Sequence, residues 1–95
     1  MTDEAQWAGA AHTADALQAA YFRTFLADER KQVADDLLHS RAQLRNCVEA
    51  KRVVGLRAMA RARSQVRELE TKQHELDRLI AALDRRFSAL WSRQG

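Results

Sequence analysis

Helix-breaking residues are almost absent from this sequence, and that absence limits the folds open to it more than any other feature. The 95 residues include no proline and three glycines, of which Gly95 ends the chain. Only Gly9 and Gly55 therefore interrupt the interior. Alanine, leucine, arginine, glutamine and glutamate, all strong helix formers, are common. The chain is therefore predicted to be all-α, with a candidate turn near Gly55.

Seam residues recur every seven positions in both halves of the chain. In the second half the two series are Met59, Val66, Gln73, Ile80, Phe87 and Ala62, Leu69, Leu76, Leu83, Leu90. In the first half they are Leu26, Val33, Ser40, Cys47, Val54 and Arg30, Leu37, Leu44, Lys51. Paired series of this kind form the contact seam of a coiled coil. Residues 1–12 are weakly patterned, so we expect a loosely ordered N-terminal segment followed by one coiled-coil domain over residues 13–95.

Two architectures fit these series: an antiparallel two-helix hairpin turning near Gly55, and a long parallel coiled-coil dimer. The parallel dimer stacks Arg30 and Lys51 on their own copies, which is unfavourable for like charges. It also needs a register skip at Gly55. The hairpin is therefore preferred, although no Ser, Thr, Asp or Asn follows Val53 before Arg63 to cap a second helix.

A turn at residues 55–58, with Gly55 just past the end of the first helix, sets a definite register for the hairpin. The predicted layers pair Val54 with Met59, Lys51 with Ala62, Cys47 with Val66, Leu44 with Leu69, Ser40 with Gln73, Leu37 with Leu76, Val33 with Ile80, Arg30 with Leu83, and Leu26 with Phe87. Ser40 and Gln73 would share a polar layer that fixes the register, and Arg30 would lie along Leu83. Phe22 would face Trp91 at the open end.

Seven large apolar residues fall outside the seam of this hairpin. A two-helix hairpin buries little by itself, and an apolar stripe left over commonly packs against another helix. We therefore expect a homodimer in the form of a helical bundle, or a complex with another protein. The predicted partner-binding residues are Leu17, Tyr21, Phe25, Leu38, Val48, Leu56 and Leu79.

Charge is distributed unevenly along the chain. Residues 1–40 carry seven acidic and three basic side chains, a net charge of −4, whereas residues 41–67 carry eight basic side chains and one acidic, a net charge of +7. Clustered cations bind phosphates or acidic surfaces, and they also occur as a solvated face or against the acidic half of a neighbouring molecule. Aromatic residues are absent between Phe25 and Phe87, so base stacking has no platform there. The candidate anion-binding residues are Arg45, Lys51, Arg52, Arg57, Arg61, Arg63 and Arg67.

Residues for catalysis or metal binding are sparse. Cys47 is the only cysteine, and its seam position predicts a small buried side chain. The histidines, His12, His39 and His74, do not combine with it into the three or four ligands of a zinc site. We therefore expect no enzyme activity, no metal, no cofactor and no small-molecule substrate. The acidic N-terminus and short apolar runs predict no signal peptide and no membrane span, and the composition suggests a bacterial, cytoplasmic protein.

These observations lead to two functional hypotheses. The first is a small non-catalytic coiled-coil protein that mediates protein–protein interaction as a chaperone, adaptor or assembly subunit, with secretion as one setting. The second is a nucleic-acid-binding or ribosome-associated protein that uses the basic segment 41–67. A turn reading Val53-Val54-Gly55 lacks the tryptophan of the Trp-x-Gly turn found in one group of secreted helical hairpins, so the residues assign the chain to no family.

Overall fold

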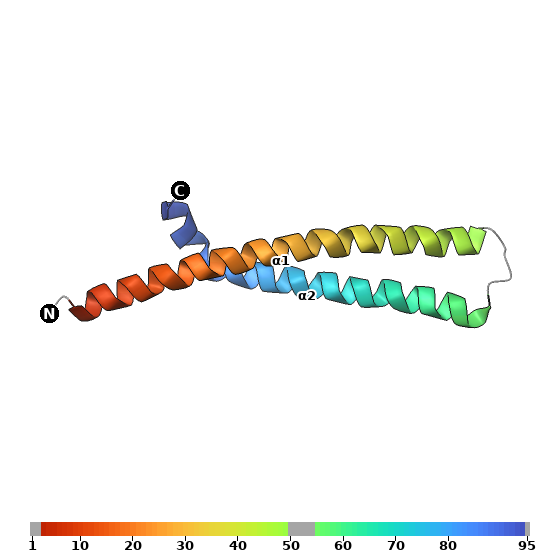
Figure 1. The fold of residues 1–95 in the computed structure, drawn as a ribbon, viewed down its shortest axis with the longest axis horizontal. Coiled ribbons are helices and arrows are strands. Elements are labelled where there is room, and N and C mark those ends of the chain that lie inside the picture. The colour runs from red at the N-terminus through yellow and green to blue at the C-terminus, as the bar shows by residue number, and fades with distance from the viewer. Residues whose placement is uncertain (1–2, 50–54, 95) are drawn as a thin grey trace.

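The structure, a computed structural model, is a hairpin of two long antiparallel helices (Figure 1). Helix α1 spans Asp3–Glu49 and helix α2 spans Leu56–Gln94. The structure describes residues 3–49 and 55–94, with side chains described for residues 13–49 and 55–93. The molecule measures 76 × 23 × 15 Å. The all-α hairpin predicted from the sequence is therefore confirmed.

Gly55 lies at the start of α2. Its carbonyl oxygen accepts hydrogen bonds from the backbone N–H of Ala58 at 2.9 Å and of Met59 at 3.3 Å, which is the position of an N-cap residue. The prediction that Gly55 ends the first helix, with a turn over residues 55–58, is therefore wrong. Glycine is acceptable as an N-cap, and no helix breaker follows it, so α2 begins immediately at Leu56. The predicted layers that contain Lys51 and Val54 lie outside the described residues.

Two apolar clusters hold the described parts of the helices together. The first lies at the open end of the hairpin, where Ala16, Ala19 and Phe87 are buried and Leu83, Leu90 and Trp91 pack against them. The second lies further toward the tip, the end formed by Glu49 and Leu56. In it Leu26, Val33 and Leu76 are buried, and Leu69, Ile80 and Leu83 pack against them.

The register of the hairpin differs from the predicted one. Leu26 was predicted to face Phe87, but Phe87 packs with Ala16 and Ala19, and Leu83 packs against the cluster that contains Leu26. Leu83 precedes Phe87 by four residues, so the two helices are offset by about one helical turn from the predicted layers. The displaced turn is the physical reason, because moving the turn slides one helix along the other.

Ion pairs between the helices accompany this register. Arg23 binds Asp84 through two parallel contacts, Nε to Oδ1 at 2.5 Å and Nη2 to Oδ2 at 3.0 Å. Arg30 pairs with Asp77 two helical turns further toward the tip. The expected packing of Arg30 along Leu83 is therefore wrong, because the guanidinium reaches a carboxylate on the facing helix. The hydrogen bond from Arg23 is the main cause that lowers the pKa of Asp84 and raises the pKa of Arg23.

The polar layer expected at Ser40 does not set the register. Ser40 is buried, but within the described residues no hydrogen bond joins it to Gln73, which is only half-buried. The nearest charged contact between the helices is Arg41 with Glu70, at 3.8 Å between Nη2 and Oε1. The register is therefore accompanied by ion pairs beside the seam, and not by the predicted hydrogen bond between a buried serine and a glutamine.

Trp91 closes the packed part of the open end. Its indole Nε1–H donates to the carbonyl oxygen of Ala16 at 2.8 Å, and its ring stacks on Phe87 with centroids 5.8 Å apart. The expected partner, Phe22, instead stacks on Phe25 with centroids 6.4 Å apart. That expectation is therefore wrong, because the shifted register places Trp91 beside Ala16. Beyond this contact α1 continues alone toward its N-terminus, and the last turns of α2 bend away from the hairpin axis (Figure 1).

Candidate functional site

Three large apolar side chains lie exposed along one side of α1. Leu17, Tyr21 and Phe25 follow one another at four-residue spacing, so they lie along one side of the helix. Tyr21 lies about 140° around the helix from the buried Leu26. The exposed fractions are 51% for Leu17, 79% for Tyr21 and 58% for Phe25. We call these three residues the outer cluster.

The surroundings of the outer cluster enlarge its apolar area. A shallow groove beside it is lined by Leu17, Ala20, Tyr21 and Thr24. Phe22 stacks on Phe25 with the two rings only 10° from parallel, and it too is about half exposed. Phe22 was not among the predicted partner-binding residues, because its ring was expected to face Trp91. Its position four residues before Leu26 could have indicated a flank of the seam instead of its centre.

The other four predicted partner-binding residues are exposed as well, but they are separated from the outer cluster. Leu38 lies 13 residues beyond Phe25, which is about 20 Å along the helix. The remaining three are Val48 near the tip, Leu56 at the first position of α2, and Leu79 on the flank of α2. All seven predicted residues are therefore exposed, yet the structure divides them into one cluster and four single positions. Their role in partner binding stays a prediction.

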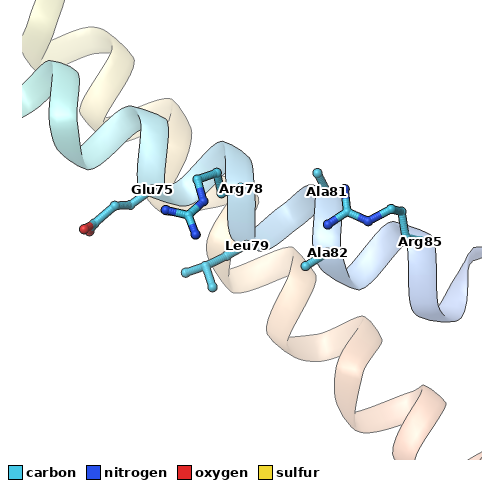
Figure 2. Close-up of a pocket in the computed structure, with 6 residues that line it drawn as sticks. All are labelled: Glu75, Arg78, Leu79, Ala81, Ala82 and Arg85. Carbon is cyan, nitrogen blue, oxygen red and sulfur yellow. The ribbon is translucent and has the colours of Figure 1, made fainter.

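Leu79 lies in a shallow depression on the surface of α2. Figure 2 shows its six lining residues, Glu75, Arg78, Leu79, Ala81, Ala82 and Arg85, all projecting from this one helix. The apolar Leu79 and Ala82 are flanked by the charged ends of Arg78 and Arg85. A depression on one helix encloses nothing, so it can contact another surface but does not surround a small molecule.

The described arginines of the predicted anion-binding set lie around the tip. They are Arg45 on α1 and Arg57, Arg61, Arg63 and Arg67 on α2. All five are exposed, and no described acidic side chain forms an ion pair with them. Lys51 and Arg52 lie outside the described residues. We call the five described arginines the basic tip.

Two of these arginines border a groove between the helices. Arg63 and Arg67 line it together with Leu44, Ala60 and Val66. Arg63 and Arg67 are four residues apart, so their guanidinium groups emerge on the same side of α2. The basic tip therefore offers to an anionic surface several cations that form no ion pair with a described acidic side chain.

The remaining candidate residues form no reactive group. Cys47 is free and half-buried, so the predicted small buried side chain is only partly covered in the hairpin. His39 and His74 are exposed, and the His12 side chain lies outside the described ones. Across residues 13–49 and 55–93, no three His, Cys, Asp or Glu side chains are grouped to hold a metal ion. Neither helix, over its described length, is apolar enough to cross a membrane.

Comparison with known proteins adds no further assignment to this geometry. A scan against protein-family models, a search of curated proteins and a search of solved structures each find no match to the chain. The candidate site therefore depends on the exposed surface itself.

Proposed function

We propose that this chain is a non-catalytic interaction protein, a chaperone, adaptor or assembly subunit, that binds an apolar helical surface through the outer cluster. The observation that carries the proposal is the exposure of Leu17, Tyr21 and Phe25 along one side of α1. Large apolar groups gathered on a surface commonly mark a protein-binding site. Their four-residue spacing suits a partner helix laid along α1.

The energetics agree with this role. Covering a large apolar side chain contributes about 1–2 kcal/mol when it is half exposed at the start. Three such residues contribute several kcal/mol, which is comparable to the loss of translational and rotational freedom on association. The outer cluster therefore supplies anchor residues, and a stable complex also needs contacts from the rest of the helix face.

The test replaces the two most exposed members of the outer cluster, Tyr21→Ser together with Phe25→Ser. Tagged wild-type and variant chains are used to capture partners from the host lysate, and helicity is checked by circular dichroism. A matched control is Leu56→Ser, which removes an apolar residue that is 89% exposed but lies at the other end of the hairpin. We expect the double variant to lose a partner that the control retains. Retention of every partner by the double variant contradicts the proposal.

A second candidate function is supported by the basic tip. Five exposed arginines without acidic partners among the described residues suit the backbone of a nucleic acid or another polyanion. Changing Arg57, Arg61 and Arg63 to glutamine should weaken such binding and reduce its dependence on salt, measured by fluorescence anisotropy with RNA and DNA of mixed sequence. Binding that is absent, or insensitive to salt, excludes this function.

A further inference from the structure

The surface that the hairpin leaves open is large for a protein of its size. Its accessible surface is 7877 Å² for a mass of 10.8 kDa. A compact monomer of that mass exposes roughly 5,500 Å². The difference is well above the roughly 800 Å² that each partner buries in a standard interface. The hairpin is elongated, at 76 × 23 × 15 Å, so a standard interface along its length would cover only part of this excess.

The outer side of α1 carries a second seam of its own. Residues there alternate at spacings of three and four, which is the spacing of a coiled-coil contact. All are exposed except Ala42, which is half-buried. Because the spacing repeats every seven residues, as the α1–α2 seam does, these positions keep one orientation relative to α2. The outer seam consists of Ala14, Leu17, Tyr21, Thr24, Asp28, Lys31, Asp35, Leu38, Ala42 and Arg45.

We propose that the occupant of this outer seam is the α1 helix of a second copy of this chain, running antiparallel. The two-fold axis passes between Asp28 and Lys31. This inference rests on the proposed function and names its partner. In this arrangement the same surface is used by both copies, as in most two-fold dimers.

One register satisfies both the apolar and the charged residues of the outer seam. With Asp28 opposite Lys31 of the second copy, Tyr21 lies opposite Leu38 of the second copy. Leu38 is otherwise a single exposed leucine, about 20 Å from the outer cluster. The same register brings Leu17 against Ala42 and Thr24 against Asp35. Each contact occurs twice because of the symmetry.

Charge favours the antiparallel orientation. The central layers place each Asp28 against a Lys31, whereas a parallel pair would place Lys31 against Lys31 and Asp28 against Asp28. At the ends, Arg45 of one copy reaches the level of Ala14 and Asp15 of the other, and both charged side chains are exposed in the single hairpin. The basic tip of each copy is thus brought beside the acidic half of its neighbour, which matches the net charges of +7 for residues 41–67 and −4 for residues 1–40.

Disulfide trapping tests the register directly. In a Cys47→Ser background, one chain carries Thr24→Cys and another carries Asp35→Cys, both at exposed polar positions that leave the outer cluster intact. Facing cysteines bridge when their Cα atoms lie within about 7 Å. In the proposed dimer the two copies of residue 24 are separated by about 16 Å along the helix axis. We expect the mixture to form a cross-linked dimer and either chain alone to form none.

The affinity test uses a charge reversal and its compensation. Sedimentation equilibrium on Asp28→Lys and on Lys31→Asp should each show a dissociation constant raised roughly tenfold or more, as for a loss of about 1.4 kcal/mol. The double variant, Asp28→Lys with Lys31→Asp, should recover the wild-type value. Helicity of all three, followed by circular dichroism, separates a dimer defect from a folding defect.

Three outcomes overturn the inference: a wild-type chain that remains monomeric at every concentration, a Thr24→Cys chain that cross-links to itself as readily as the mixture does, or a double reversal that fails to recover. The proposed function fails on a different result. The function requires that the double variant Tyr21→Ser with Phe25→Ser lose a partner. If the wild-type chain is monomeric and captures a foreign partner that the double variant does not, the homodimer is excluded and the proposed function stands.

Discussion

The open end and the tip of this hairpin are held together by different kinds of contact. At the open end, Phe87 is buried against Ala16 and Ala19, and Trp91 adds a ring stack and a hydrogen bond. Toward the tip, no described side chain is fully buried over residues 41–49 or 55–65. The exposed aromatic residues also lie at the open end, whereas five exposed arginines without acidic partners among the described residues lie at the tip. Buried apolar packing and exposed aromatic surface are therefore concentrated at the open end, and net positive charge at the tip.

The difference in packing indicates which end of the hairpin opens first. Local unfolding starts where few apolar contacts are buried. The tight ion pair between Arg23 and Asp84 lies in the open half, and the pair nearest the tip, Arg41 with Glu70, is the longest at 3.8 Å. We therefore expect the tip to separate more readily than the open end, which leaves the basic tip adaptable and the outer cluster on a rigid support.

Among changes that test the difference between the two ends, Phe87→Ala is expected to lower the free energy of unfolding the most. Removing a buried phenylalanine destabilises by about 3–5 kcal/mol, a large fraction of the total for a small domain. The matched control is Met59→Ala, a half-buried residue near the tip, which should cost clearly less. Urea unfolding followed by circular dichroism measures both free energies. Equal losses at the two sites contradict the uneven packing.

A smaller effect of opposite sign is expected at the tip, where Gly55→Ser should stabilise the hairpin. A Cβ at Gly55 meets nothing within 4 Å, and the backbone there is outside the left-handed range that favours glycine. Serine caps a helix slightly better than glycine and restricts the unfolded chain, which together contribute about 0.5–1 kcal/mol. Gly55→Ala separates the two contributions, because it restricts the chain without providing a cap. A fall in the melting temperature of Gly55→Ser would show that α2 begins elsewhere.

The ion pairs should show a smaller gradient along the hairpin. A double-mutant cycle on Arg23→Ala and Asp84→Ala should give a coupling free energy of about 0.5–1 kcal/mol, since both groups are partly exposed. The same cycle on Arg41 and Glu70 should give a value near zero, because that contact is longer and both side chains are about half exposed. Added salt should reduce the first coupling. A larger coupling at Arg41 and Glu70 would reverse the expected gradient.

The smallest expected effect is on pH dependence. The pKa of Asp84 is lower in the folded hairpin than in the unfolded chain because Arg23 hydrogen-bonds its carboxylate. The contribution of this pair is therefore complete above the ordinary pKa of aspartate, about 3.9, and is lost as the pH falls through the lower folded value. Asp84→Asn should lower the free energy of unfolding near neutral pH by the contribution of this pair, and it should flatten the slope of stability against pH in that acidic range. If stability falls with acid in the variant as steeply as in the wild type, Asp84 does not contribute to the pH dependence of stability.

The exposed residues could be predicted from the sequence more completely than the contacts between the helices. Leu17, Tyr21 and Phe25 are outside the seam for any register, since the side of a helix that a residue occupies depends only on its spacing from its neighbours. The partners of Leu26 and Phe87 depend on where the turn falls. A slip of one turn keeps an apolar face against an apolar face, so hydropathy alone does not distinguish the two registers.

A signal for the true register was nevertheless present. Arg23 and Arg30 are seven residues apart, and so are Asp77 and Asp84, so two ion pairs form together only when the antiparallel helices are offset as observed. The predicted register instead placed Arg30 in the seam along Leu83 and depended on the uncharged pair of Ser40 and Gln73. Matching the spacing of opposite charges on the two helices would have identified the observed offset.

By itself the sequence determined that the chain is helical, that it turns near Gly55, and which apolar side chains face outward, because these follow from residue propensities and from the period of one helix. Three features could be seen only in the tertiary structure. They are the offset between α1 and α2, the position of Gly55 at the start of α2, and the burial of Phe87 against two alanines. Those features depend on the free energy of contacts between residues far apart in the chain. Several offsets bury similar apolar area, and the ion pairs and the close fit of small residues against aromatic rings distinguish them.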